Sequence, residues 1–407
     1  MSESAADSPP PLWQVVPLAE YRLPAEPAQQ VASRKLRDFW RLLRSDDASA
    51  QAPARAEKDL RALPEVRLEH LVPPVDWGGA QTALDGCLAD WLRDDTRAVR
   101  FFVGPPGGGM AEALRHWAGQ RGWPVIEPPT AEQVLAGDIA WLEDWPRDGE
   151  GWLLPSLERC YLRHPQGLAL VRRLLEAVTA GRLGRGLVVC DSWAWAFLQR
   201  VWVIPQPEVY TLQAFDGERL SAYFLQLAHR GGRHLRVRNA HTGEDILPWP
   251  DTPSDEAEKT RAASAELRRL AAHCRGNLGV AWTYWRTHLR TEPDPEEAEA
   301  VEQTEDRQGE ADTDTVWWSS GRAPVMPVET GDDLAFVLHA LLLHNGLDLA
   351  TLERLLPLSH GQLAAVVARL VQLGLVDQAG GRHRVARLGY AAAREFLRGR
   401  GYLVDAF

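Results

Sequence analysis

Lysine is nearly absent from this chain, which holds 45 basic residues among 407 but only three lysines, Lys35, Lys58 and Lys259. Chemistry that depends on a lysine ammonium is therefore confined to these three positions. Cysteine is also scarce: the four residues stand far apart with no Cys-x-x-Cys pair, which excludes a disulfide framework and a zinc knuckle.

Long apolar runs are missing as well. No segment offers about 18 uninterrupted apolar residues, so a transmembrane helix is not expected. Residues 1–11 are acidic and proline-rich and lack the basic and apolar regions of a signal peptide. Together with the isolated cysteines, these features predict a cytoplasmic protein, and peripheral association with a membrane is left open.

With 45% hydrophobic and 25% charged residues, the chain is long enough for two or three domains with substantial cores. Its formal charge of −11 is concentrated in one place. Residues 291–315 hold eleven acidic residues and one arginine, Arg307, and so carry ten of the net negative charges. We interpret this stretch as an acidic tether between folded parts that are themselves close to neutral.

The apolar patterning divides the chain into five parts. Residues 1–70 are an N-terminal extension with a short amphipathic helix near 35–43. Residues 71–215 alternate strands with helices, the pattern of a parallel sheet with helices on its faces. Its strands are expected at 99–103, 123–126, 139–145, 187–190 and 209–212, with a long helical stretch at 155–180.

The remaining parts are mostly helical. Residues 216–290 read as helices with a hairpin inserted at 234–247, and 291–330 form the acidic linker. Residues 331–407 give three helices, a two-stranded wing around Gly380-Gly381 and a closing helix. Helices followed by a glycine-tipped hairpin are the outline of a winged helix.

The strand expected at 99–103 is followed by a loop with the frame of a phosphate-binding loop. The consensus G-x-x-x-x-G-K-[ST] uses lysine to meet the β- and γ-phosphates and a hydroxyl to hold Mg²⁺, while glycine amides complete the cradle. This chain has methionine and alanine at those two positions. The loop consists of Gly104, Pro105, Pro106, Gly107, Gly108, Gly109, Met110 and Ala111.

Without the lysine ammonium and the hydroxyl, the loop is not expected to hydrolyse a nucleotide. A charge-assisted hydrogen bond is worth roughly 1.5–3 kcal/mol, and several would be lost together. None of the three lysines is near the loop, and among nearby residues only an arginine such as Arg115 offers a substitute. We therefore expect the glycine cradle to be retained without the groups that act on phosphate.

In the order of these elements, residues 71–407 resemble the AAA+ superfamily, especially origin-recognition-like and STAND-type ATPases, which couple a P-loop core and a helical lid to a winged helix. The resemblance implies an α/β fold with a P-loop NTPase-like parallel sheet, a helical lid with an inserted hairpin, and a C-terminal winged helix. It rests on element order and, more weakly, on motifs.

The resemblance also implies roles for four residues. Glu143 and Asp144, which close the strand expected at 139–145, match the acidic pair that handles Mg²⁺ and water. Ser192, after the strand at 187–190, matches a polar sensor of the γ-phosphate, and Arg200 matches an arginine finger. Plainer alternatives are loop carboxylates, a helix-capping hydroxyl and a surface arginine.

A turn at 274–279 is similar to the Gly-Asn-x-Arg turn of the family's lid, but Gly279 stands where a sensor arginine is usual. Lysine, hydroxyl and sensor arginine are thus all missing. We predict a pseudo-ATPase, a catalytically degenerate AAA+ homologue that acts as a scaffold or regulatory module through protein partners. No cofactor is predicted. The alternative is a protein that binds ATP without tight Mg²⁺, or hydrolyses it, at a non-standard site.

A DNA-binding initiator or transcription regulator is a further alternative. In the predicted winged helix, the third helix at 359–373 offers Arg369, and the wing offers Arg382 and Arg384. These side chains favour non-specific contact with the DNA backbone over base readout. A winged helix that binds protein is an equally open interpretation, as is an oligomer.

A second basic element lies in the predicted hairpin, where His234, Arg236 and Arg238 alternate along one face of a strand. We interpret this face as a candidate binding site for a polyanion, either nucleic acid or the protein's own acidic tether. The plainer alternative is a solvated strand face.

Overall fold

The computed structural model describes residues 11–24, 59–94, 99–146, 151–248, 264–292, 314–319, 323–327 and 331–407. The chain divides into two compact units. Unit 1 draws on residues 23–75 and 214–322, and unit 2 on residues 13–22, 76–213 and 323–407. The helix expected near 35–43 lies outside the described residues, and the predicted division into five parts stays a prediction.

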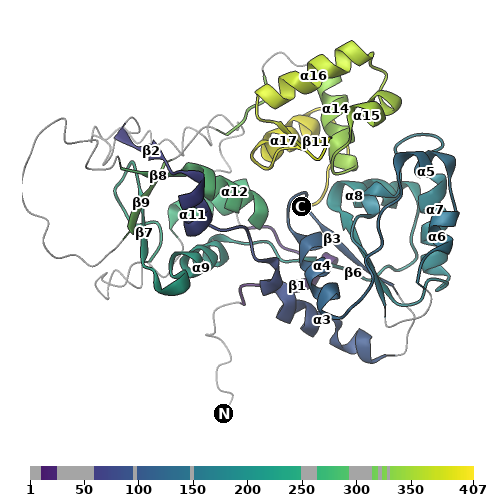
Figure 1. The fold of residues 1–407 in the computed structure, drawn as a ribbon, viewed down its shortest axis with the longest axis horizontal. Coiled ribbons are helices and arrows are strands. Elements are labelled where there is room, and N and C mark those ends of the chain that lie inside the picture. The colour runs from purple at the N-terminus through teal and green to yellow at the C-terminus, as the bar shows by residue number, and fades with distance from the viewer. Residues whose placement is uncertain are drawn as a thin grey trace, which may run out of the picture. The chain divides into compact units, whose positions relative to one another are not determined.

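Unit 2 is built on a five-stranded sheet in the order β1-β6-β3-β5-β4 (Figure 1). Parallel pairing joins β6 to β3, β3 to β5 and β5 to β4, whereas β1 pairs antiparallel with β6 at one edge. Part of the predicted N-terminal extension therefore completes the core sheet. The strands are β1 (Val15–Pro17), β3 (Val99–Gly104), β4 (Trp152–Leu154), β5 (Gly186–Asp191) and β6 (Val209–Leu212).

Helices cover both faces of this sheet because its central strands are apolar on both sides. Phe101 and Val103 of β3 are buried in a cluster with side chains of α7 (Ala169–Thr179) and α8 (Ser192–Val201). Phe102 is buried in the opposite cluster, with α3 (Gln81–Arg93) and α4 (Met110–Gln120). The expected alternation of strand and helix is thus confirmed for the centre of the sheet.

The segment 139–145 contains a short helix flanked by turns and not the expected strand. Helix α6 (Ala140–Glu143) begins after Asp138, whose carboxylate accepts a hydrogen bond of 3.1 Å from the Ala140 N–H. Trp141 and Trp145 are four residues apart and their ring centroids lie 5.2 Å apart, the neighbour spacing of a helical turn.

The sheet strand in this part of the chain is β4. It precedes a short 3-10 turn, η4 (Leu157–Arg159), which lies in the range expected to be helical. Helix α5 (Ala131–Ala136) lies just upstream.

Residues 123–126 also differ from expectation, since they join the sheet only by an isolated bridge between Val125 and Leu153. The long helical stretch expected at 155–180 is confirmed only in its second half, as α7. In both cases a short apolar run leaves strand and helix hard to distinguish by periodicity alone.

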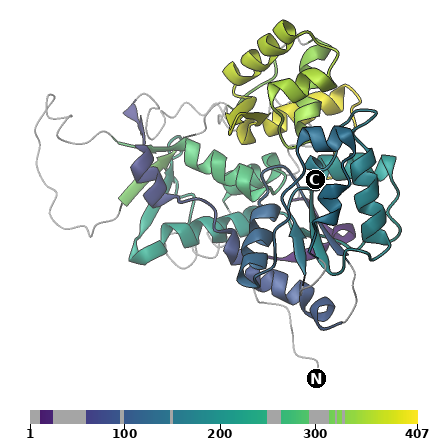
Figure 2. The same ribbon diagram turned by 45° about the vertical axis from the view of Figure 1, so that its right-hand side comes forward.

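The C-terminal helices also belong to unit 2. Helices α14 (Asp332–Leu343), α15 (Leu349–Leu355) and α16 (His360–Gln372) precede the antiparallel hairpin of β10 (Val376–Ala379) and β11 (Arg382–Val385). Its two-residue turn is Gly380-Gly381, with φ of 59° and 77°, values that glycine adopts at little cost. After the 3-10 turn η6 (Arg387–Gly389) comes α17 (Tyr390–Gly399). In both views these yellow-green elements lie beside α8 of the core (Figures 1 and 2).

Unit 1 combines helices with a second sheet. Its helices include α2 (Glu65–Leu71), α9 (Gly217–Ala228), α11 (Ala265–His273) and α12 (Leu278–His288). The sheet has the order β2-β8-β9-β7. Its strands are β2 (Arg61–Ala62), β7 (Leu235–Asn239), β8 (Leu289–Thr291) and β9 (Asp314–Trp318).

The inserted strand and the acidic stretch are connected through this sheet. Strand β7 turns back at an isolated bridge from Arg238 to Asp245, but its main partner is β9, which runs parallel to it. Strands β8 and β9 pair antiparallel and stand on either side of the acidic stretch, so both ends of that stretch are fixed in neighbouring strands. The described ends of the acidic segment therefore belong to unit 1.

The predicted fold class is confirmed: an α/β core on a parallel sheet, a helical part with inserted strands, and C-terminal helices with a two-stranded hairpin. None of the helices in the described ranges is both long enough and apolar enough to cross a membrane.

Close packing of β4 on β5 gives a test of this core. A Cβ built on Gly186 would lie 2.2 Å from the ring of Trp152, whose indole N–H donates to the Leu183 carbonyl at 2.6 Å. We expect Gly186→Ala to destabilise the protein by about 1–3 kcal/mol through overpacking. The matched control is Gly86→Ala on the exposed side of α3, where nothing lies within 4 Å of the new methyl group. There a gain of about 1 kcal/mol is expected. Urea unfolding distinguishes the two, and equal effects would contradict the packing argument.

Candidate functional site

The glycine loop lies between β3 and α4, at the carboxyl end of a central parallel strand. Gly107 and Gly109 adopt φ of 70° and 78°, the left-handed region that favours glycine. The Gly108 N–H closes a turn on the Pro105 carbonyl at 2.9 Å. The predicted loop therefore has the strand–loop–helix setting in which backbone amides of a helix N-terminus bind anions.

The residues at the lysine and hydroxyl positions of this loop are parts of the core. Met110 is 4% exposed and packs in the apolar cluster that contains Phe102 and Leu114, and Ala111 packs against the same cluster. A side chain in this cluster contributes apolar contacts and no charge. Neither position supplies a group that could meet a phosphate or Mg²⁺.

Two side chains from other parts of unit 2 lie directly on the loop. A Cβ on Gly109 would fall 2.2 Å from ring carbons of Trp77, and that ring meets Trp13 edge to face at 5.9 Å between centroids. A Cβ on Gly107 would fall 3.1 Å from Nε of Arg387, in η6. The loop is therefore covered by an indole at one glycine and by a guanidinium at another.

Arg387 brings a guanidinium to this loop, a contact that no local pattern in the sequence predicts. Burial lowers the pKa of its guanidinium, and the carboxylate of Glu112, in the first turn of α4, acts in the opposite direction. The side chain of Arg115, the local substitute that the sequence suggests, makes no hydrogen bond or ion pair among the described residues. The long separation along the chain leaves no local signal for Arg387.

The neighbouring strand ends do not carry the acidic pair that the resemblance implies. Strand β4 ends at Leu154 and is followed by Pro155 and Ser156. Glu143 and Asp144 lie in α6 and at its C-terminal cap, and therefore not at the end of a sheet strand. Their assignment as a metal-binding pair loses its structural basis, because it depended on a strand at 139–145.

Two buried carboxyl groups do occur at this edge, Glu158 in η4 and Asp191 at the end of β5, where Asp191 is paired in register with Gly104. The Asp191 N–H donates to Oε2 of Glu158 at 3.1 Å, and Oδ1 of Asp191 caps α8 by accepting from the Trp193 N–H at 3.0 Å. Burial raises the pKa of Glu158 to about 7. Burial and the nearby Glu158 also raise the pKa of Asp191.

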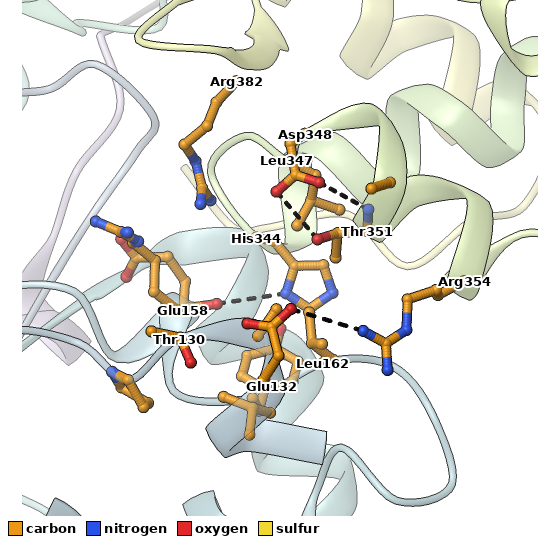
Figure 3. Close-up of a pocket in the computed structure, with 16 residues that line it drawn as sticks. Thr130, Glu132, Glu158, Leu162, His344, Leu347, Asp348, Thr351, Arg354 and Arg382 are labelled. Carbon is orange, nitrogen blue, oxygen red and sulfur yellow. Dashed lines mark hydrogen bonds and ion pairs between the residues drawn. The ribbon is translucent and has the colours of Figure 1, made fainter. Parts of the chain in front are cut away.

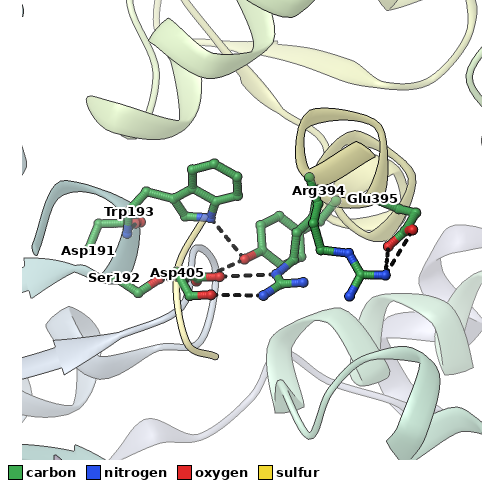
Figure 4. Close-up of polar contacts among 8 residues, drawn as sticks. Asp191, Ser192, Trp193, Arg394, Glu395 and Asp405 are labelled. Atoms are coloured by element: carbon green, nitrogen blue, oxygen red, sulfur yellow. Dashed lines mark hydrogen bonds and ion pairs between the residues drawn. The ribbon is translucent and has the colours of Figure 1, made fainter. Parts of the chain in front are cut away.

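Ser192, predicted as a sensor, is bound by the C-terminal tail. Its hydroxyl donates to Oδ2 of Asp405 (Figure 4). The same carboxylate oxygen accepts from the Tyr390 hydroxyl at 3.1 Å, and the indole N–H of Trp193 donates to that hydroxyl at 3.0 Å. The polar group at the end of β5 is thus satisfied within the chain.

A buried ion pair completes this network. Nε of Arg394, in α17, lies 3.0 Å from Oδ1 of Asp405, and the two side chains are 8% and 1% exposed. A second guanidinium N–H donates to the Asp405 carbonyl at 2.8 Å. Burial raises the pKa of Asp405, and the contacts from Ser192 and Arg394 oppose that rise. Asp405 therefore joins α17 to the strand edge of the core.

A second set of contacts joins α14 to η4. The Tyr161 hydroxyl donates to the Leu343 carbonyl at 2.9 Å. The imidazole of His344 lies between the Arg163 N–H and the Glu158 carbonyl, at 3.3 Å from each. Burial lowers the pKa of His344 to about 4, so the ring is neutral: Nε2 accepts from Arg163 and Nδ1 donates to Glu158.

The other predicted site residues are not part of this edge. Arg200 is exposed in the last turn of α8, and its role as an arginine finger stays a prediction. Arg369 is exposed on α16. In the wing, Arg384 pairs with Asp377 at 2.8 Å and Arg382 donates to the Gly346 carbonyl.

The strand predicted to bind a polyanion is neutralised in part by its own loop. Arg236 makes two hydrogen bonds of 2.8 Å to the carboxylate of Asp245. Arg238 donates to the Gly243 carbonyl at 2.9 Å and lies over the ring of Trp317. His234 lies beside His229 and immediately precedes the strand. The polyanion assignment stays a prediction, and Asp245 supplies a competing anion.

Comparisons with known proteins give only distant matches. No family model and no curated protein matches the chain. Among solved structures, it is similar to Cdc6p from Pyrobaculum aerophilum, with 12% identity, a TM-score of 0.27 and coverage of 87% of this chain and 97% of that chain. It is also similar to the Orc1 protein of Aeropyrum pernix in complex with DNA, with 14% identity, a TM-score of 0.29 and coverage of 85% and 99%.

The buried network around Asp405 gives a stability prediction. Asp405→Ala leaves Arg394 buried without its partner, and we expect a loss of about 3–5 kcal/mol. The control is Arg398→Ala on the same helix, whose exposed pair with Glu395 is worth no more than about 1 kcal/mol. Urea unfolding measures both. Replacing the pair together, as Arg394→Met with Asp405→Leu, is expected to cost less than Asp405→Ala alone, and a larger cost would contradict the proposed origin of the loss.

Glu158 gives a pH prediction. Because its pKa is raised in the folded protein, the folded state binds a proton that the unfolded chain releases between pH 4.5 and about 7. The contribution of Glu158 to stability therefore falls as the pH rises through this window. Buried histidines such as His344, whose pKa is lowered to about 4, act in the opposite direction, so the effect of Glu158 is measured as the difference between wild type and variant. Glu158→Gln removes that contribution, of up to roughly 3 kcal/mol by pH 8. Urea unfolding at pH 5 and pH 8 measures the difference, and the exposed Glu176→Gln should keep the wild-type slope.

Proposed function

We propose that this protein is a catalytically degenerate P-loop protein of the AAA+ type, in which the core is a scaffold for its C-terminal helices and for protein partners. The observation that carries the proposal is that the chain's own side chains occupy the strand edge that a nucleotide-driven enzyme reserves for phosphate. Arg387 lies on Gly107, Trp77 lies on Gly109, and Asp405 binds Ser192.

The chemical inventory at this edge supports the same proposal. Transfer of a phosphoryl group depends on a cation and a metal ion placed at the β- and γ-phosphates, with a group that orients the nucleophile. Here the relevant positions hold buried Met110, apolar Ala111 and the Pro155-Ser156 pair. The residues present do not fit a bound Mg–ATP in its catalytic arrangement, so no hydrolytic step is derived.

The docked C-terminal helices favour a scaffold over a freely moving arm. Buried polar contacts tie α14 to η4 and α17 to the end of β5, and breaking them would leave Arg394 and Asp405 unpaired in the interior. A regulatory movement within unit 2 therefore requires a partner that binds the undocked state more tightly than the docked one.

One observation favours a second candidate function, a protein that binds nucleotide without hydrolysing it. Arg387 brings a guanidinium to the loop, and guanidinium groups bind phosphate well. In this alternative Arg387 substitutes in part for the missing lysine. DNA binding through the hairpin has less support, because Arg384 already pairs with Asp377 within the chain.

Calorimetry with Mg–ATP separates the two candidates. For the scaffold we expect no saturable binding up to about 1 mM nucleotide and no release of phosphate above that of a buffer control. Micromolar binding that is abolished by Gly109→Asp and weakened by Arg387→Ala would establish the nucleotide-binding alternative instead. Arg398→Ala, an exposed arginine of the same C-terminal region, serves as the control for a general change in charge.

A further inference from the structure

A cavity of about 330 Å³ lies in unit 2, away from the glycine loop, between α5 and η4 on one side and α15 and β11 on the other (Figure 3). Its apolar lining includes Val134, Leu162 and Leu347, and its polar lining includes Arg159, Arg354 and Arg382. This volume is at the lower end of the range for small-molecule sites, and an apolar lining with a few convergent polar groups is typical of them.

Two of the arginines bring positive charge together without a paired carboxylate. Within the described part of the chain, the guanidinium of Arg159 has no hydrogen bond or ion pair. Arg382 points toward the cavity in Figure 3, and its one recorded hydrogen bond is to a neutral group, the Gly346 carbonyl. Burial lowers the pKa of Arg382, the nearby charge of Arg159 lowers it further, and the carboxylates of Asp348 and Glu158 oppose the shift.

Three carboxylates also line the cavity, and among the described residues each makes its hydrogen bonds and ion pairs with groups other than Arg159 and Arg382. Asp348 is engaged at the start of α15, where it accepts hydrogen bonds of 2.7 Å and 3.0 Å from the N–H and hydroxyl of Thr351. Glu158 accepts from the Asp191 N–H. Glu132 lies 3.8 Å from Arg354, and both side chains are largely exposed. Among the described residues, Arg159 and Arg382 thus have no carboxylate in direct contact, although Asp348 and Glu158 lie near enough to oppose the effect of burial on the pKa of Arg382.

We propose that this cavity binds a small organic phosphate, with Arg159 and Arg382 holding a phosphate monoester and the apolar lining receiving its carbon part. A phosphate monoester carries a charge of about −1.5 to −2 at pH 7, which matches two guanidinium groups. The monoester is favoured over free phosphate because Val134, Leu162 and Leu347 offer nothing to a fully hydrated ion. This site is separate from the loop discussed above.

Such a ligand would contact both the core and the C-terminal helices. Arg159 belongs to η4, whereas Arg382 belongs to β11. A ligand held by both stabilises the docked arrangement, by an amount that grows with the logarithm of its free concentration above the dissociation constant. The cavity thus gives the scaffold a means of responding to a metabolite without using the glycine loop.

Isothermal titration of the full chain tests the proposal, with phenyl phosphate and inorganic phosphate as probes at constant ionic strength. We expect phenyl phosphate to bind, and to bind more tightly than inorganic phosphate. Arg159→Ala should weaken the binding by about tenfold or more, and Arg159→Glu should weaken it further. Arg159 is exposed, so neither variant is expected to unfold the protein. The control is Arg172→Ala, an exposed arginine of α7 outside the cavity, which should leave the affinity unchanged.

Three results would overturn the proposal: no binding of phenyl phosphate to the wild-type protein, equal affinities for wild type and Arg159→Ala, or an equal loss in Arg172→Ala. An arm with Arg387→Ala distinguishes this cavity from the loop. Binding that is lost in Arg387→Ala but retained in Arg159→Ala would place the phosphate at the glycine loop, contradicting this inference and favouring the nucleotide-binding alternative. Loss in Arg159→Ala alone supports the cavity, whatever the outcome with Mg–ATP.

Discussion

The buried ion pair between Arg394 and Asp405 is the interaction on which the arrangement of unit 2 depends. Two ions removed from water are stable only if they remain paired and hydrogen-bonded, and Ser192, Tyr390 and the Asp405 carbonyl complete the set. Because Ser192 follows the central strand β5 and Arg394 belongs to α17, the pair fixes the last helix against the edge of the core sheet. The C-terminal helices consequently supply hydrogen-bond partners to a polar group at the edge of the core sheet.

Docking of the C-terminal helices also changes the surroundings of the glycine loop. In a nucleotide-driven enzyme the loop amides, a lysine and a metal ion hold phosphate at the carboxyl ends of parallel strands. Here Met110 contributes to the apolar core and Arg387 covers Gly107. The backbone conformation with two left-handed glycines is retained, while side chains of the protein take the positions around it. The backbone conformation of the loop can therefore persist without phosphate binding, because the conformation depends on its glycines and phosphate binding depends on charged side chains.

The cavity beside η4 shows the same C-terminal helices in another role. It is formed by residues from the core and from α15 and β11, and among the described residues neither Arg159 nor Arg382 has a carboxylate in direct contact there. The carboxylates that lie nearby already serve a helix start or a backbone N–H. Docking therefore has two consequences: it covers the strand edge at the loop, and it closes a cavity with a cationic lining beside η4.

The sequence by itself determined the central strands β3, β5 and β6, the glycine loop and the C-terminal hairpin, because each has a strong local signal of apolar runs or of glycines at required turns. It also identified the missing lysine and hydroxyl. The sequence does not predict the helix within 139–145, because apolar residues in so short a segment fit a strand as well as a helix. It also does not predict β4, because three apolar residues are too few to show the two-residue alternation of a strand. Only the tertiary structure decided that Arg387, Asp405 and Arg394 lie at the core and that Arg159 meets Arg382. These pairings join residues far apart in the chain, and a single sequence carries no local pattern that specifies which distant charges meet.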